Sequence, residues 1–428
     1  MNIYQYPQKS DWAGIIRRPA LEKKNLRATI TEVFEKVKND GDSALQYYTS
    51  KFDGVSLDSF KVSQEEIEKA SNEVSDELKA AIQHAKKNIE TFHRSQEEET
   101  KKIETVPGVE CWRESRGIEK VGIYIPGGTA PLFSTVLMLA IPAKLADCKQ
   151  IVLCSPANKE GAIDPAILYT AQLCGITEMF KIGGSQAIAA MSLGTETVPK
   201  VYKIFGPGNQ YVTAAKELAT ELGLAIDMPA GPSEVLLIAD QQAVPEFCAA
   251  DLLSQAEHGA DSQVVFISTD ETVFKETLLE LEDQLNQLPR KELAAKAIEN
   301  SRFILMESLD EAFELSNCYA SEHLILAIAN PEIWTGKIRN AGSVFLGNYA
   351  CESAGDYASG TNHTLPTNGF AKNYSGVSLD SFVRKVTFQK LSEKGIQNLG
   401  KTIEVMAEAE GLLAHKNAVS VRLKSLES

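Results

Sequence analysis

The chain has 428 residues, a formal net charge of -15 and a hydrophobic fraction of 43%. This length predicts two or three domains with large cores, and the acidic charge argues against nucleic acid or an anionic membrane as a partner, because both repel an acidic surface. The seven cysteines show no C-x-x-C spacing, which favours reduced thiols. The sequence also has no signal-peptide pattern and no apolar run of the roughly 18 residues that a membrane span needs. These features predict a cytoplasmic protein.

Helical patterns dominate residues 23–103, which follow an N-terminal arm of residues 1–22. Apolar residues recur with helical spacing over 26–37. Ser63 and Glu66 form a capping box, a pair of residues that predicts the start of another helix. This part of the chain is therefore expected to be a set of amphipathic helices.

From residue 121 onward, short apolar runs alternate with helical stretches. Continuous apolar strands separated by helices are typical of parallel sheets that are covered on both faces. The sequence therefore predicts an α/β fold with two successive Rossmann-like units of about five strands each, and we expect the early helices to cover the second sheet. The expected strands are 121–125, 151–154, 179–182, 201–205 and 225–227 in the first set, and 235–239, 263–268, 303–306, 323–328 and 343–346 in the second.

The alternation of strands and helices breaks at residues 347–376, which are small, polar and rich in glycine. A long segment without a strand pattern is usually functional or disordered, and the aromatic residues and single histidine of this one favour function. After Leu379 the sequence becomes helical again to its end. This tail is too short to fold well alone, so we expect it to dock on another surface.

Two residues near the end of one predicted helix are candidate metal ligands. Gln255 and His258 are three positions apart, so their side chains share one helix face, and Gly259 ends the helix. The simpler interpretation is a histidine that the helix dipole stabilises, and an amide oxygen is an uncommon zinc ligand. From this fragment alone, metal binding is the less favoured of the two alternatives.

Glu322 and His323 stand where a loop enters a predicted strand. Adjacent side chains of an extended backbone point to opposite faces, but at the mouth of a strand both can reach a cleft. A histidine is a natural general base near neutral pH, and a glutamate can activate water. The alternative is an exposed glutamate beside a half-buried structural histidine.

Three glycine turns follow predicted strands, at 126–129, 183–186 and 206–211. Turns at the carboxyl ends of strands in one sheet line a crevice, which is the usual ligand position in open α/β sheets. The third turn is a weak dinucleotide fingerprint, because Tyr211 stands where the third glycine belongs. Ordinary turn chemistry explains each turn taken singly.

Asp356, His363, Glu410 and His415 are further candidates in polar or helical surroundings. No two of them have the spacing of a familiar zinc motif, and H-E-x-x-H does not occur in the sequence. The residues alone therefore do not join them into one site.

Taken together, these motifs resemble the histidinol dehydrogenase family over essentially the whole chain. The most specific stretch is 225–236, which is similar to the family signature. Supporting stretches are 124–128, 205–209, 251–259, 322–324, 353–363 and 414–418.

The resemblance implies oxidation of L-histidinol to L-histidine through L-histidinal, with zinc and NAD as cofactors, as the last step of histidine biosynthesis. The zinc ligands would be Gln255, His258, Asp356 and, from the neighbouring subunit of a homodimer, His415. Glu322 and His323 would be the catalytic pair, with His323 removing the alcohol proton and Glu322 activating water. Ser233, His363 and Glu410 would help to hold the substrate together with His323 and the zinc ligands, and Tyr124, Gln186 and Asn209 would contact NAD.

The resemblance also implies that different domains hold the metal and the NAD, and that the helical tail is exchanged in the dimer. The metal and catalytic residues would belong to a first Rossmann-like domain and NAD to a second. The expected parts are an arm at 1–22, the first domain at 23–120 plus 233–377, the second at 121–232 and the tail at 378–428.

Three alternative functions remain open at this point. The nearest is a dehydrogenase on the same scaffold that oxidises another small polar alcohol, such as a sulphonated diol. It would need a changed substrate pocket, especially at Glu410 and His363, and both of these residues are present here. The others are zinc-dependent hydrolysis without NAD and a non-catalytic zinc or nucleotide binder. A thiohemiacetal mechanism through Cys148 or Cys154 is not favoured, because Cys154 lies in an apolar strand where a thiol is normally inert.

Overall fold

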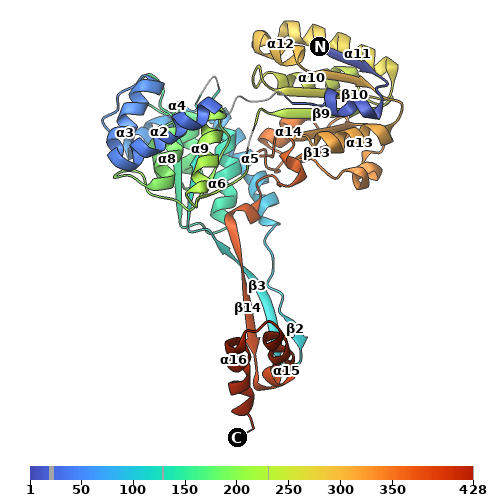
Figure 1. The fold of residues 1–428 in the computed structure, drawn as a ribbon. Coiled ribbons are helices and arrows are strands. Elements are labelled where there is room, and N and C mark those ends of the chain that lie inside the picture. Colours follow the sequence, from blue (N-terminus) through green and yellow to red (C-terminus); the bar gives the residue numbers. More distant parts are fainter. Residues whose placement is uncertain (19–23, 128–129, 230, 428) are drawn as a thin grey trace.

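The computed structural model describes residues 1–18, 24–127, 130–229 and 231–427. It shows two α/β lobes and a narrow stalk that carries a small helical unit away from them (Figure 1). Within these described ranges, no helix is long and apolar enough to cross a membrane. Parts of several predicted segments lie outside the described residues. These are 19–22 of the arm, Lys23 of the helical region, Gly128 and Thr129 of the first glycine turn, Ala230 of the signature stretch and Ser428 of the tail.

The first lobe, here called the five-stranded lobe, is built on a parallel sheet with the strand order β6-β5-β4-β7-β8. Its strands are β4 (Lys120–Tyr124), β5 (Gln150–Ser155), β6 (Glu178–Lys181), β7 (Lys203–Phe205) and β8 (Ala225–Ile226), and the helices that follow them are α6 (Phe133–Leu145), α7 (Pro165–Leu173), α8 (Gly184–Leu193) and α9 (Gln210–Glu221). Two apolar cores receive side chains from these strands, as expected for strands that are apolar throughout. The first predicted set of strands is confirmed.

The N-terminal helices are α2 (Lys24–Asp40), α3 (Asp42–Tyr48), the short π-helical turn η2 (Thr49–Asp53), α4 (Gln64–Glu73) and α5 (Asp76–Arg94). Ser63 and Glu66 form the predicted capping box at the start of α4. The prediction that these helices cover the second sheet is wrong, because α2 packs against α8 and α9, α4 against α7, and α5 against α6. They therefore belong with the five-stranded sheet, contrary to the expected grouping of 23–120 with 233–377. Helical spacing shows that a face is buried but does not specify which sheet receives it.

The second lobe, here called the six-stranded lobe, has a parallel sheet with the order β1-β11-β10-β9-β12-β13. Its strands are β1 (Asn2–Gln5), β9 (Glu234–Ala239), β10 (Gln263–Ser268), β11 (Arg302–Leu305), β12 (His323–Ala327) and β13 (Ser343–Leu346). Its helices and turns are η1 (Lys9–Asp11), α1 (Trp12–Ile15), α10 (Pro245–Ala256), α11 (Glu271–Gln287), α12 (Lys291–Glu299), α13 (Leu309–Tyr319), η3 (Pro331–Lys337) and α14 (Glu352–Tyr357). Five strands match the second predicted set. The sixth strand, β1, lies in the N-terminal arm, for which the sequence predicts no strand. It is short, mostly exposed and at the edge of the sheet, so it lacks the continuous apolar run that predicts the other strands.

The stalk is an antiparallel sheet of β2 (Ile103–Val106), β3 (Val109–Gly117) and β14 (Val383–Leu391), which follows the short turns η4 (Phe370–Lys372) and η5 (Leu379–Phe382). It carries α15 (Glu393–Ala409) and α16 (Leu413–Lys424) at the end far from both lobes (Figure 1). The predicted helical tail is confirmed for α15 and α16 and wrong for β14. This strand has exposed or half-buried residues on both faces, and its partner β3 lies far away in the sequence.

Candidate active site

The candidate site lies between the two lobes. A cavity of about 380 Å³ is lined by the carboxyl ends of β4 and β7 in the five-stranded lobe and by the amino ends of β9 and β12 in the six-stranded lobe. The loops at these strand ends of the two sheets place polar side chains around this one cavity. The predicted site residues that line this cavity are Tyr124, Asn209, Ser233, His258, Glu322 and His363.

The predicted catalytic pair, Glu322 and His323, is buried at the start of β12. His323 lies among three carboxylates: its Nε2 is 3.5 Å from Oδ1 of Asp356, and its Nδ1 is 3.8 Å from Oε2 of Glu322 and 3.9 Å from Oε1 of Glu352. Burial raises the pKa of Glu322 and that of Glu352 to about 8. Burial would lower the pKa of His323, but the charges of Glu352 and Glu322 outweigh it and raise this pKa to about 10. Such a group of strongly shifted acids and bases is typical of a proton-transfer site.

The peptide backbone of Glu234 contacts both members of the pair. Its N–H donates to Oε2 of Glu322 at 2.9 Å, and its carbonyl oxygen accepts from Nδ1 of His323 at 3.3 Å. Because a carbonyl oxygen can only accept, Nδ1 carries a proton and Nε2 is the basic nitrogen of the neutral imidazole. The backbone of β9 therefore sets the orientation of the catalytic pair.

His258, Glu352 and Asp356 form a candidate metal centre. One ligand atom of each lies within 4.8 Å of the ligand atoms of the other two. In the described part of the chain, both amide atoms of Gln255 and Oε2 of Glu352 are buried without a hydrogen-bond partner. Gln255 lies in the last turn of α10, and this helix packs against α14, which carries Glu352 and Asp356. The orphaned oxygens of Gln255 and Glu352, beside a histidine and a second carboxylate, fit a metal such as zinc.

Glu352 is a member of this cluster that the sequence analysis does not single out. It stands four positions before Asp356 in α14, so both carboxylates project from one face of the helix. The available signal was this spacing. It was missed because residues 347–376 were expected to be irregular and therefore to have no helix face.

The structure brings His363 to the site but not the two candidates of the tail. Nδ1 of His363 donates to the backbone oxygen of Asp356 at 2.8 Å, and its Nε2 lies 3.0 Å from Oγ1 of Thr135. Glu410, at the end of α15, and His415, in α16, are exposed in the helical unit beyond the stalk (Figure 1). Within one chain, these two residues are remote from the catalytic pair.

A second cavity, of about 1000 Å³, extends along the carboxyl edge of the five-stranded sheet. Tyr124, Gln186 and Asn209 all line it, and Tyr124 and Asn209 also line the 380 Å³ cavity. Both amide atoms of Gln186 are buried without a hydrogen-bond partner among the described residues. The hydroxyl of Tyr124 accepts from the backbone N–H of Gly184 at 3.0 Å, which holds its ring against the start of α8. The two cavities therefore share a wall made of residues that the sequence predicts for one cofactor.

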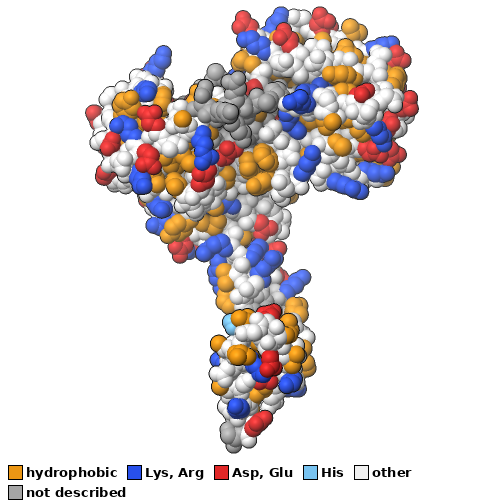
Figure 2. Space-filling model, in the orientation of Figure 1, with side chains coloured by type: hydrophobic (Ala, Val, Ile, Leu, Met, Phe, Trp, Pro, Cys, Tyr) orange, Lys and Arg blue, Asp and Glu red, His pale blue; other side chains and the backbone are white. Residues whose placement is uncertain are grey.

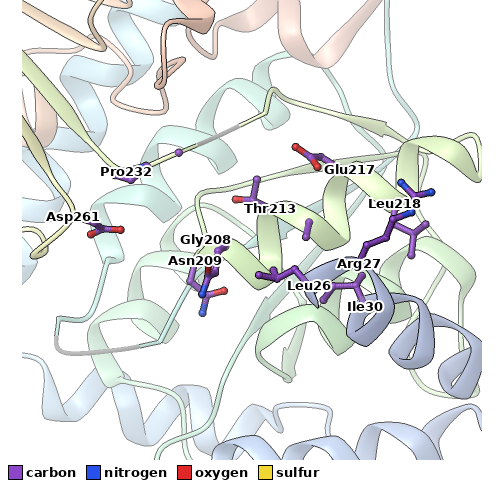
Figure 3. Close-up of a pocket in the computed structure, with 13 residues that line it drawn as sticks. Leu26, Arg27, Ile30, Gly208, Asn209, Thr213, Glu217, Leu218, Pro232 and Asp261 are labelled. Carbon is purple, nitrogen blue, oxygen red and sulfur yellow. The ribbon is translucent and has the colours of Figure 1, made fainter. Parts of the chain in front are cut away.

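Asn209 also borders a third cavity, of about 440 Å³, where it lies between Asp261 and Leu26 of α2 (Figure 3). Its Oδ1 accepts from the backbone N–H groups of Tyr211 and Val212 at 3.0 and 3.2 Å and so caps α9. The NH₂ group of the Asn209 side chain therefore remains as the donor that could contact a ligand. All three cavities meet at this residue.

The glycine turn after β7 has a steric requirement that ordinary turn chemistry does not explain. Gly206 has a φ of 127°, and a Cβ atom there would lie 2.1 Å from the backbone oxygen of Tyr124. A Cβ atom at Gly208 would lie 2.3 Å from Cγ1 of Val212. Gly206 lets the chain pass close to Tyr124 in the wall between the cavities, and Gly208 lets it pass close to Val212 of α9.

The cysteines near the five-stranded sheet are poor nucleophiles. Burial raises the pKa of Cys148 to about 12 and raises that of Cys154 further. Both thiols therefore stay protonated at neutral pH, which agrees with the choice against a thiohemiacetal mechanism.

Comparisons with known proteins agree on one family. The family model for histidinol dehydrogenase matches residues 16–423. The chain is 59% identical over 427 residues to a histidinol dehydrogenase of Bacteroides thetaiotaomicron, with both chains fully covered, and 53% identical over 425 residues to one of Haemophilus influenzae, with 99% of each chain covered. Among solved structures, the histidinol dehydrogenase of Elizabethkingia anophelis is 62% identical, with a TM-score of 0.99 over 100% of this chain and 99% of the other.

Proposed function

The chain belongs to the histidinol dehydrogenase family, and from this premise we propose that it oxidises L-histidinol to L-histidine through L-histidinal, the last step of histidine biosynthesis. The relatives favour this substrate over the sulphonated diol of the alternative. The observation that carries the proposal is the common wall of the two cavities. One cavity holds Glu322 and the other is large enough for a dinucleotide, and Tyr124 and Asn209 line both.

We assign NAD to the 1000 Å³ cavity, with contacts to Tyr124, Gln186 and Asn209. When bound, NAD supplies the acceptor for the hydride that leaves the substrate carbon. The buried and unpartnered amide of Gln186 supports this assignment, because a buried polar group without a partner is costly unless a ligand satisfies it. The NH₂ group of Asn209, which also lines the cavity that holds Glu322, offers a second donor.

We assign one zinc ion per subunit to Gln255, His258 and Asp356, with His415 of the partner subunit as the fourth ligand. When bound, zinc orients the imidazole and amine of the substrate rather than activating water. The unpartnered amide of Gln255 and the cluster of His258, Glu352 and Asp356 support a metal here. We interpret Glu352 as an acidic partner of His323 beside the ligands.

Proton transfer is assigned to the catalytic pair. His323 takes the alcohol proton at Nε2, since its Nδ1 donates to the carbonyl oxygen of Glu234. This role requires a neutral imidazole, whereas the surrounding carboxylates raise the pKa of His323 to about 10. A cation held at Asp356 would offset part of that negative charge and lower the pKa of His323 again. Glu322 takes a proton from the water that hydrates the aldehyde. The hydrate then gives its hydride to a second NAD and releases a hydroxyl proton, which leaves the carboxylic acid. Ser233, His363 and Glu410 are assigned to hold the substrate, and Glu410 would pair with a substrate cation.

We further propose a homodimer in which the tail reaches the neighbouring subunit. Hydrophobic side chains lie on the surface of the helical unit beyond the stalk (Figure 2), where Met406 is 60% and Leu413 is 64% exposed. Burial of this surface against a second copy would stabilise the unit and bring Glu410 and His415 to the partner's site. The seven free cysteines support a reducing, cytoplasmic location.

A coupled assay tests the function directly. The purified protein is given L-histidinol and NAD, with added zinc or with a chelator, and NADH absorbance and histidine are measured. We expect two NADH for each histidine formed and loss of activity with the chelator. Hydrolysis, or binding without reaction, would give no NADH and would contradict the proposal.

A further inference from the structure

Arg18, where the described part of the N-terminal arm ends, reaches the start of β9. Its Nε and Nη2 donate to Oε1 and Oε2 of Glu234 at 2.5 and 2.7 Å, and Nη2 also donates to the backbone oxygen of Tyr319 at 2.9 Å. The guanidinium carbon lies 3.9 Å from the centroid of the Tyr319 ring. The side chain of Arg18 is 16% exposed and that of Glu234 is 1% exposed. This is a buried two-point ion pair, which is directional as well as strong.

The carboxylate of Glu234 also binds a segment other than the arm. Its Oε1 also accepts from the backbone N–H of Asn368 at 3.0 Å, so the ion pair joins the arm to the segment that follows His363. The peptide of the same residue donates to Glu322 and accepts from His323. A shift of the Glu234 side chain would therefore move the two backbone groups that orient the catalytic pair.

We propose that Arg18 and Glu234 form a positioning pair that holds Glu322 and His323 in their reactive arrangement. The inference rests on the proposed function, because it takes these two residues as the proton-transfer groups. Neither Arg18 nor Glu234 lines the 380 Å³ cavity, so the pair acts through the backbone of β9 and not by contact with the substrate. Loss of the guanidinium would leave the carboxylate of Glu234 buried without its counter-ion, and the start of β9 would have to move to hydrate it.

The chain offers a matched control for this proposal. Arg302 is another buried arginine that ties down the same arm: it donates to the backbone oxygens of Ile15 and Arg17 and to Oε1 of Gln263. It makes no hydrogen bond to Glu234 in the described structure. Arg302→Met therefore removes an anchor of the arm and a nearby positive charge, but none of the hydrogen bonds to the carboxylate of Glu234.

The experiment compares Arg18→Met, Arg18→Lys, the double variant Arg18→Met/Glu234→Gln and Arg302→Met with the unaltered protein. For each, kcat and KM are measured with NAD, using histidinol and, separately, histidinal, and rates are expressed per folded chain from circular dichroism. We expect Arg18→Met to lower kcat for both substrates by about 10- to 100-fold, since small misplacements of catalytic groups cost this much. The KM for NAD should stay within about twofold, since no contact to the cofactor changes. The kcat of Arg18→Lys should lie between those of Arg18→Met and the unaltered protein. The kcat of the double variant should exceed that of Arg18→Met, because the double variant has no unpaired charge at position 234.

Two results would overturn the positioning pair while leaving the proposed function intact. One is a kcat per folded chain of Arg18→Met that stays within about twofold of the value of the unaltered protein. If the catalytic pair were misplaced, the kcat would fall by more than this. The other is an equal loss in Arg302→Met, which would assign the effect to the arm as a whole. Absence of NADH formation in the unaltered protein would overturn the proposed function and this inference together.

Discussion

Nε2 of His323 lies 3.5 Å from Oδ1 of Asp356, so the catalytic pair and the candidate metal ligands are direct neighbours. Burial would raise the pKa of Asp356, but the hydrogen-bonding and charge of His323 outweigh it and lower this pKa. Asp356 is therefore ionised at neutral pH, as a carboxylate ligand must be. One carboxylate then could serve two purposes, since it faces the imidazole that we assign as the general base and is available to a metal.

The first prediction concerns metal content. His258→Ala should lose bound zinc, because it removes the one imidazole that a single chain contributes to the cluster of Glu352 and Asp356. We expect the affinity for zinc to fall by more than about 100-fold, since loss of a direct ligand should exceed the 10- to 100-fold cost of losing an outer partner. Metal analysis after dialysis measures the change.

The matched control for metal content is His84→Ala, which removes an exposed histidine on α5. Its zinc content should equal that of the unaltered protein. Undiminished zinc in His258→Ala would refute the assigned site, and equal losses in both variants would point to histidine-dependent binding elsewhere on the surface.

The fold shows what the sequence can and cannot predict. Ten strands of the two parallel sheets are predictable because most of them are short, continuous apolar runs, as in β10, where Val264 and Phe266 are fully buried. β1 and β14 are not, because their residues are largely exposed and their partners are β11 and β3, far away in the chain. Pairing between strands that are far apart in the sequence leaves no local pattern. The sequence of α2 likewise does not specify which of the two sheets the helix packs against.

The site divides in the same way. Spacing alone left Gln255 and His258 ambiguous, and the resemblance to a family, not the pattern, proposed a single centre. Glu352 was within reach of sequence reasoning through its distance of four residues from Asp356, had a helix been expected there. The contact of Arg18 with Glu234 joins residues that are 216 positions apart, and no periodicity encodes it.

The second prediction tests the exchange of the tail. His415→Ala and His258→Ala subunits should each be inactive alone. When they are unfolded, mixed and refolded, we expect about a quarter of the unaltered activity, because half of the dimers are mixed and each mixed dimer has one intact site. The steady-state rate of NADH formation measures the recovery.

A mixture of His258→Ala with Asp356→Asn subunits is the control for this exchange. Both positions belong to the six-stranded lobe, so neither site of the mixed dimer is intact and no activity should return. Recovery in both mixtures would indicate exchange of whole lobes, and recovery in neither would count against a tail that serves the partner's site.

The third prediction separates the two oxidation steps. Glu322→Gln keeps the volume of the side chain and an oxygen that can accept from the N–H of Glu234, but it removes the base that we assign to the water step. We expect the oxidation of histidinal to slow by about 100-fold or more, the usual contribution of a general base, and the oxidation of histidinol to histidinal to slow less. Single-turnover measurements of NADH with each substrate resolve the steps. Equal slowing of both would remove this role from Glu322.

The fourth prediction is a pH dependence of stability that originates in η2. Burial raises the pKa of Asp53 from its usual 3.8 to about 6, and its Oδ2 is buried without a hydrogen-bond partner among the described residues. Because the folded state binds this proton more tightly than the unfolded state, ionised Asp53 destabilises the folded protein above pH 6, and this effect fades as the pH falls through 6 towards 4.

Asp53→Asn should therefore raise the free energy of unfolding by about 1 to 2 kcal/mol at pH 8, a value reduced to allow for partial exposure, and by little at pH 4. Thermal unfolding at both pH values measures the difference, with Asp58→Asn, a change of an exposed neighbour, as the control. A gain of the same size at both pH values would mean that the charge of Asp53 is not what destabilises the folded state.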